Sequence, residues 1–314
     1  MTTANFADQL IDEMKRKKSR LIVGLDPSQE HAPASLGGEV VATLGLGTRE
    51  IGVARQWAMR EFCERIIAAT EDIAVGYKVQ LAYFERYGSA GMHVLERLLL
   101  EHEPKLFILD GKRGDIGATS KAYADAYFYD KGTDDQSPLL CDAVTLNGYL
   151  GKDALEPFFP FLAQNKGAFV LAKTSNPSSG DLQDQEIDGE PVYARMARLV
   201  NEWGADFVGD HGYSSLGLVV GATYPEAARR VRQLAPKSLI LVPGIGVQGG
   251  RPQDADAFAG EDGCGAVFNF SRSIIYAYKY GPFADEHDED KFETAARVAA
   301  EHYRVSLNEA LGEP

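Results

Sequence analysis

Short runs of apolar residues alternate along this chain with longer stretches whose apolar positions repeat at helical spacing. Runs that are apolar at nearly every position are typical of parallel strands buried on both faces, and their alternation with helices predicts a parallel sheet. We expect eight such strands, the number that closes a (β/α)8 barrel. They cover residues 21–25, 73–79, 105–109, 143–146, 168–172, 216–220, 239–242 and 266–270.

Helices are expected between most of these strands, at residues 49–70, 91–100, 120–130, 152–162, 191–203 and 225–234. Residues 27–48, with four glycines and two prolines, are interpreted as an insertion after the first strand. Residues 178–189 are expected to form a mobile loop after the fifth strand. Both segments follow the carboxyl end of a strand, where a lid over an active site belongs. The acidic run at 285–290 predicts a solvated loop before a last helix.

Length and composition favour a single domain. The chain has 314 residues, of which 45% are hydrophobic, so it can bury a large core. One (β/α)8 barrel spanning residues 1–314, a TIM barrel with loop insertions on the face formed by the strand C-termini, would use the whole chain.

Charge and cysteine content exclude several kinds of partner and site. Lysine and arginine number 32 against 46 acidic residues, a net charge of −14, so no broad field attracts nucleic acid or an anionic membrane. The three cysteines lack metal-ligand spacing and fit a reduced, cytoplasmic protein. The N-terminal residues lack the apolar core of a signal peptide, and no stretch approaches the ~20 apolar residues of a membrane span.

The most informative segment is residues 110–119, Asp-Gly-Lys-Arg-Gly-Asp-Ile-Gly-Ala-Thr, which follows the third strand. Alternate side chains of an extended segment share a face, so Asp110 and Lys112 point the same way at the end of the sheet where parallel α/β folds bind ligands. Asp115 lies three residues further on and is not expected to fold back onto its own lysine. The alternative interpretation is a helix-capping aspartate with two surface charges.

Two other strand ends carry charged residues. Asp26 follows the first strand, and its carboxylate could accept two hydrogen bonds from a diol; the alternative is a turn made by Asp26-Pro27. Lys78 lies within the apolar second strand, where an unpaired ammonium would be costly, so we expect it to face a carboxylate. A purely structural ion pair is the alternative for Lys78.

The ends of the last two strands predict a phosphate site. Residues 243–250 contain four glycines, which let backbone amides approach an anion closely. Arg272 follows the eighth strand and can donate two parallel hydrogen bonds to a phosphate, although a structural role is the alternative. The loops after strands seven and eight form the common phosphate site of barrel enzymes. No Walker-type phosphate loop, dinucleotide fingerprint or metal-binding motif occurs in the sequence.

The pattern Asp-x-Lys-x-x-Asp-Ile-Gly-x-Thr at residues 110–119 resembles the signature of the orotidine 5'-phosphate decarboxylase family. Members of this family remove carbon dioxide from orotidine monophosphate to give uridine monophosphate. Other segments match in the same order over roughly residues 20–280, and the length and the sequence Lys-Thr-Ser-Asn-Pro at 173–177 resemble the longer bacterial subfamily. Many members carry a different pair before the serine, so Lys173-Thr174 departs from that pattern.

The resemblance implies a homodimer with shared sites and a reaction without metal or organic cofactor. It implies that Lys112 stabilises the carbanion and donates its proton, within an alternating row of charges. The residues of this row are Lys78, Asp110, Lys112 and Asp115. The resemblance also implies that Asp26 binds the ribose, Ser175 reads the pyrimidine, Gln248 and Arg272 bind the phosphate, and Asp115, Ile116 and Thr119 reach into the partner's pocket.

Two other functions stay open. One is a magnesium-dependent decarboxylase or aldolase of the same superfamily that acts on sugar phosphates, although such enzymes are shorter and usually have an acidic metal ligand where this chain has Lys78. The other is a nucleotide-binding protein without catalytic activity, although every matched catalytic position is filled.

Overall fold

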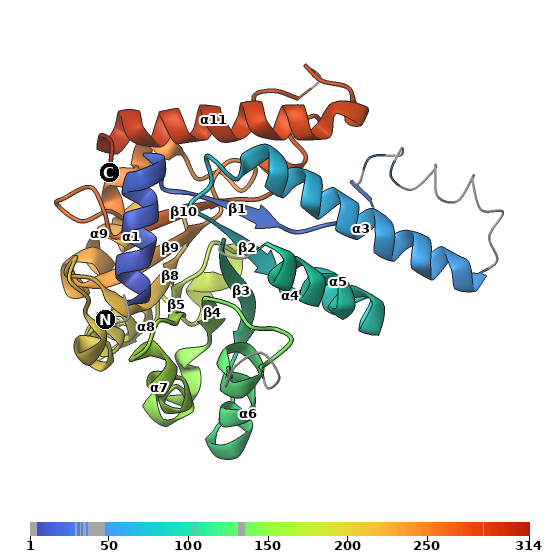
Figure 1. Ribbon diagram of the computed structural model, residues 1–314. Helices are drawn as coiled ribbons and strands as arrows, with labels where there is room; N and C mark the ends of the chain where they lie inside the picture. Colours follow the sequence, from blue (N-terminus) through green and yellow to red (C-terminus); the bar gives the residue numbers. More distant parts are fainter. Residues whose placement is uncertain are drawn as a thin grey trace.

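The eight predicted strands form a closed parallel barrel (Figure 1). The computed structural model describes residues 5–28, 30, 31, 33, 36, 48–102, 105–130, 136–284 and 286–314. The barrel order is β1-β10-β9-β8-β5-β4-β3-β2, and all neighbouring pairs are parallel. The strands are β1 (Leu21–Leu25), β2 (Gly76–Gln80), β3 (Leu106–Arg113), β4 (Ala143–Leu146), β5 (Gly167–Lys173), β8 (Ser214–Val220), β9 (Ser238–Pro243) and β10 (Ala266–Phe270). The predicted fold class is therefore confirmed.

Two strand boundaries differ from the prediction by three residues or more. The second strand starts at Gly76, three residues later than expected. The third continues through Arg113, so the charged motif begins inside the strand and not after it.

Helices pack around the outside of the barrel (Figure 1). Most lie where the sequence predicts them, and the short helices α4 and α10 are additions. They are α1 (Phe6–Lys17), α3 (Thr48–Thr70), α4 (Leu81–Glu85), α5 (Gly88–Glu101), α6 (Gly117–Phe128), α7 (Phe159–Leu162), α8 (Val192–Trp203), α9 (Pro225–Leu234), α10 (Arg272–Ile275) and α11 (Phe292–Leu311). All helices among the described residues are too short or too polar to cross a membrane.

The continuous helix expected at residues 152–162 is wrong. This segment forms short 3-10 turns, η2 (Lys152–Ala154) and η3 (Glu156–Phe158), followed by the single turn of α7. Pro157 and Pro160 each lack an amide donor and crowd the preceding turn, so an uninterrupted α-helix cannot form here.

The expected insertion and the expected mobile loop have different outcomes. Most of residues 27–48 lie outside the described residues. Residues 178–189 follow β5 and contain most of a 3-10 turn, η4 (Pro177–Asp181), and part of a small antiparallel hairpin made of β6 (Glu186–Ile187) and β7 (Glu190–Pro191). The mobility of this loop stays a prediction. Part of the acidic run at 285–290 forms the start of a 3-10 turn, η7 (Glu289–Lys291), directly before α11.

Helix α1 closes the N-terminal end of the barrel. Its apolar residues, including Phe6, Leu10 and Ile11, are buried together with inward-facing strand residues such as Phe169. The rings of Phe6 and Phe169 meet edge to face, with centroids 6.1 Å apart. A Cβ atom at Gly167 would lie 2.2 Å from the Phe6 ring, so a glycine is needed where β5 passes this helix. The opposite end of the barrel is left for the site.

Candidate active site

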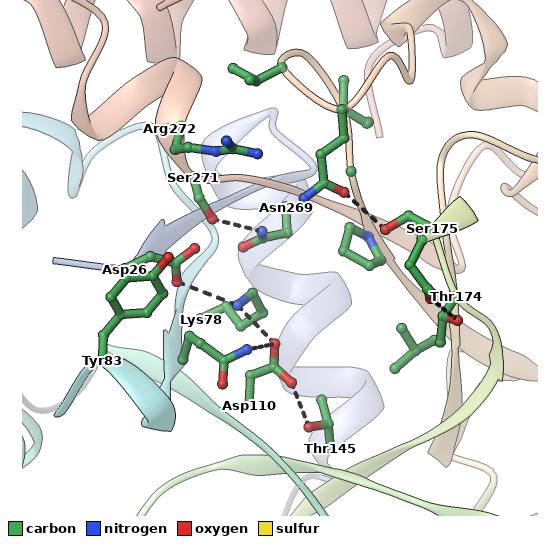
Figure 2. A pocket seen from close by; sticks show the side chains of 18 of the residues that line it. Asp26, Lys78, Tyr83, Asp110, Thr145, Thr174, Ser175, Asn269, Ser271 and Arg272 are labelled. Atoms are coloured by element: carbon green, nitrogen blue, oxygen red, sulfur yellow. Dashed lines mark hydrogen bonds and ion pairs between the residues drawn. The ribbon is translucent and has the colours of Figure 1, made fainter. Parts of the chain in front are cut away.

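A cavity of about 660 Å³ occupies the C-terminal end of the barrel (Figure 2). This volume falls within the range of about 300–1,000 Å³ that is usual for small-molecule sites. Each of the eight strands, or the residue directly after it, contributes a lining side chain: Asp26, Lys78, Asp110, Thr145, Leu171, Val219, Leu241 and Asn269. The site therefore has the position that is usual for a barrel enzyme.

Asp110 is the centre of a network of charges at the bottom of this cavity. Its Oδ1 lies 2.6 Å from Lys112 Nζ, and its Oδ2 lies 3.0 Å from Lys78 Nζ. The amide of Gln80 donates to Oδ2 at 3.1 Å, and the hydroxyl of Thr145 donates to Oδ1 at 2.7 Å. Figure 2 shows Lys78 and Thr145 on opposite sides of this carboxylate. One aspartate thus holds two lysines in one small volume.

The strand geometry explains why Lys112 turns toward Asp110. The pairing of β3 with β4 shifts register between Leu109 and Arg113, so the strand bulges at the charged residues. Lys112 has a φ of 46°, a left-handed backbone conformation that residues other than glycine rarely adopt. Its backbone amide donates to Thr145 Oγ1 at 3.0 Å, which holds this conformation. Local backbone strain of this kind often occurs at functional sites.

The network keeps both buried members charged. Burial alone would raise the pKa of Asp110, but Lys78 and Lys112 outweigh this effect and hold the pKa far below its usual range. Burial alone would lower the pKa of Lys78, but Asp110 and Asp26 outweigh it and raise the pKa. The prediction that Lys78 faces a carboxylate is confirmed. At neutral pH the cavity presents fixed opposite charges to a ligand.

Asp26 lies at the edge of this network. Its Oδ1 is 3.7 Å from Lys78 Nζ, so Lys78 lies between two aspartates. The close approach of β1 to β10 brings Asp26 near the last strand. A Cβ atom at Gly24 would lie 1.9 Å from Ser271 Oγ, so only glycine fits at this point of β1.

The glycine loop and Arg272 lie on the other side of the cavity. Three glycines of the loop have positive φ, namely Gly244, Gly246 and Gly249. Within this loop, Gln248 Oε1 accepts a hydrogen bond from Ser175 Oγ at 2.9 Å. Arg272 begins α10 and lines the cavity, and its guanidinium has no hydrogen bond or ion pair with any described residue. Its donors are therefore available to an anion.

Three predicted site residues are not in the cavity of their own chain. Asp115, Ile116 and Thr119 do not line it, and Asp115 Oδ1 accepts a hydrogen bond from the backbone amide of Ile116 at 2.8 Å. The Ile116 side chain is 57% exposed, which is unusual for a large apolar residue. Asp115 and Ile116 directly precede α6, and Thr119 lies in its first turn.

Several polar residues of the site were not predicted from the sequence. Gln80 could have been found, because it lies two positions after Lys78 and so shares its face of β2. Thr145 and Asn269 are buried polar residues within apolar strands and carry no local pattern of their own. The amide oxygen of Asn269 lacks a hydrogen-bond partner among the described residues, which makes it a candidate contact for a ligand. Asn147, directly after β4, caps a 3-10 turn, and its Oδ1 accepts from the amide of Tyr149.

The described residues contain no group of three or more histidine, cysteine, aspartate or glutamate residues that could hold a metal ion.

Known proteins are similar to this chain in both sequence and fold. The sequence profile described as the orotidine 5'-phosphate decarboxylase / HUMPS family matches residues 19–281. The chain belongs to this family. It is 39% identical to the orotidine 5'-phosphate decarboxylase of Caldicellulosiruptor bescii over 312 residues, covering 98% of this chain and 99% of the relative. It is 41% identical to the protein of the same name from Rhodopirellula baltica over 309 residues, covering 98% of each.

A solved structure of a family member agrees with the barrel. The OMP decarboxylase of Leishmania donovani superposes with a TM-score of 0.73 at 30% identity, covering 98% of each chain. The description of the family profile joins two groups, orotidine 5'-phosphate decarboxylase and HUMPS. The two relatives from Caldicellulosiruptor bescii and Rhodopirellula baltica carry the name of the first group.

Proposed function

We propose that this chain decarboxylates orotidine 5'-monophosphate to uridine 5'-monophosphate, a step in de novo pyrimidine synthesis. The observation that carries the proposal is the row of charges Lys78–Asp110–Lys112, which lies inside the cavity of a chain whose relatives are named for this reaction. A fixed ammonium beside a fixed carboxylate suits a reaction in which charge moves from a leaving carboxylate to a ring carbon.

In the proposed reaction, the bond between pyrimidine carbon six and the carboxyl carbon breaks, and carbon dioxide leaves. The electron pair stays on carbon six, which has no ordinary electron sink. The Lys112 ammonium stabilises this carbanion and then donates its proton to it. Atoms balance without an oxidant, a metal or an organic cofactor. Asp110 holds Lys112 in place through the 2.6 Å contact, and Lys78 keeps Asp110 ionised.

The remaining cavity residues suit the other parts of the nucleotide. Asp26 has a carboxylate that can accept two hydrogen bonds from the ribose hydroxyls. Arg272, with free donors, and Gln248 suit the phosphate. Ser175 lies beside Gln248 and suits the pyrimidine edge.

We also propose a homodimer in which Asp115, Ile116 and Thr119 enter the partner's cavity. Support comes from their absence from their own cavity and from the exposure of Ile116. The loops after β3 and β4 lie side by side, since a Cβ atom at Gly114 would be 3.2 Å from the carbonyl oxygen of Asn147. Tyr149, just beyond, is 76% exposed. An outward apolar surface here is suited to burial against a second copy.

The three cysteines are free and buried, which supports a reducing compartment such as the cytoplasm.

The test is to incubate the purified protein with orotidine monophosphate and a chelator while following loss of the orotate chromophore. Turnover with the chelator supports the proposal. Turnover that the chelator abolishes, or that occurs only with a sugar phosphate and magnesium, would assign the chain to the metal-dependent branch. Binding of uridine monophosphate without turnover would indicate a non-catalytic nucleotide-binding protein.

A further inference from the structure

A second buried lysine lies directly beside the cavity. Lys173 ends β5 and is only 1% exposed, yet it does not line the cavity. Its Nζ lies 2.7 Å from Asp184 Oδ1 and 4.4 Å from the centre of the Tyr224 ring. An ammonium removed from water is costly unless it is paired, and both the carboxylate and the ring face stabilise it. The position of Asp184 is therefore tied to the end of β5.

The residue before Asp184 binds the residue after Lys173. Gln183 Oε1 accepts from the backbone amide of Thr174 at 2.9 Å, and Gln183 Nε2 donates to the Thr174 hydroxyl at 2.8 Å. The Thr174 hydroxyl in turn donates to Asn176 Oδ1 at 2.7 Å. Two adjacent residues of the loop after β5 thus bind two adjacent residues at the end of that strand.

These contacts continue into the cavity. Thr174, Ser175 and Asn176 all line it. Figure 2 shows Thr174 and Ser175 at its edge. Ser175 donates to Gln248 on the glycine loop, so its position affects a group on the proposed phosphate side. A second contact comes from Tyr224, the residue directly before α9. Its hydroxyl donates to the Asn176 carbonyl at 3.4 Å.

We propose that the ion pair of Lys173 and Asp184 is a positioning latch: it fixes the segment 174–176 in the cavity and, through Ser175, orients Gln248. Lys173 and Asp184 touch no substrate atom in this proposal, and they act through the residues that do. This inference rests on the proposed function, since its readout is orotidine monophosphate decarboxylation.

Two variants break the latch in different ways. Asp184→Ala removes the half-exposed partner, and Lys173→Met replaces the buried ammonium with an apolar side chain of similar length, leaving no buried charge unpaired. Asp181→Ala is the matched control, because Asp181 is an exposed aspartate of the same loop. Both latch variants should lower kcat/KM by about 10- to 100-fold, the usual result of small misplacement in a site. The control should stay within about twofold of the wild type.

A double-mutant cycle separates positioning from simple bracing. In a Ser175→Ala background, Asp184→Ala should cost much less than it does alone, because the latch acts through Ser175. Latch variants that lose thermal stability but keep wild-type kcat/KM would overturn the proposal, as would losses that multiply fully with Ser175→Ala. Wild-type protein that fails to decarboxylate orotidine monophosphate would overturn the proposed function itself. Active wild type with unaffected latch variants would overturn the latch alone.

Discussion

The Thr145 hydroxyl donates to Asp110 Oδ1 at 2.7 Å while it accepts from the backbone amide of Lys112 at 3.0 Å. One side chain on β4 therefore fixes both the carboxylate and the strained backbone of the neighbouring strand. The hydroxyl donates one hydrogen bond and accepts another, and its two partners, Asp110 and Lys112, belong to the same charged row. Removal of the hydroxyl should therefore disturb both residues.

Thr145→Val should lower kcat/KM by about 10- to 100-fold, which corresponds to about 1–3 kcal/mol for a buried polar group that loses its partner. Valine has nearly the same shape as threonine and leaves the packing intact, so the loss would come from the hydroxyl. Thr145→Ser, which keeps the hydroxyl, is the control and should stay close to the wild type. Equal activity of the valine and serine variants would show that the hydroxyl does not position Lys112.

Lys112→Ala should lower turnover by at least about 10³-fold, since it removes the proposed proton donor and the stabilising charge together. The protein should remain folded, because Asp110 keeps its contacts with Lys78, Gln80 and Thr145. It should also still bind uridine monophosphate, which calorimetry measures. Substantial decarboxylation by this variant would remove Lys112 from the proton-donor role.

Arg272→Ala should lower kcat/KM by about 10- to 100-fold, in line with the roughly 1.5–3 kcal/mol of a hydrogen bond to a charged group. In the wild type, free phosphite should partly restore turnover of a substrate that lacks the phosphate, and this activation should weaken in the variant. Arg251→Ala, at an exposed arginine outside the cavity, is the matched control. Wild-type kinetics for Arg272→Ala would mean that the phosphate binds elsewhere.

Mixed dimers test the shared site. If Asp115 serves the partner's Lys112, homodimers of Lys112→Ala and of Asp115→Ala are both defective. A mixed dimer has one site with both defects and one intact site. Random exchange makes about half of the dimers mixed, so roughly a quarter of all sites should recover, as two-fold symmetry requires. Co-refolding the two variants and measuring decarboxylation against each alone gives the result.

The control for this experiment mixes Lys112→Ala with Arg272→Ala. Both residues line the cavity of the same chain, so a mixed dimer contains no intact site and activity should not return. Absence of recovery in the first mixture, with mixed dimers demonstrated, would place Asp115 outside the partner's chemistry.

The barrel was predictable because its strands are buried on both faces and so read as continuous apolar runs. The charged motif was predictable because Asp110 and Lys112 are two residues apart on one strand. The break in the helix expected at 152–162 was also visible in the sequence, because Pro157 and Pro160 cannot be accommodated inside a continuous α-helix.

Other features depend on the folded arrangement. The bulge that gives Lys112 its positive φ arises from the pairing of β3 with β4, which no local pattern specifies. The contact between Lys173 and Asp184 joins residues eleven positions apart, across a loop whose path only the structure gives. Thr145 likewise gains its role from a neighbouring strand and not from its own sequence context.

Because Phe6 and the rest of α1 fill one end of the barrel, the cavity is blind-ended. A ligand that enters at the C-terminal end must leave by the same opening. If the proposed reaction takes place here, the nucleotide product and the next substrate use the same opening and cannot pass each other. Helix α1 lies at the opposite end of the barrel from the reacting groups, yet by closing that end it requires the product to leave before the next substrate binds.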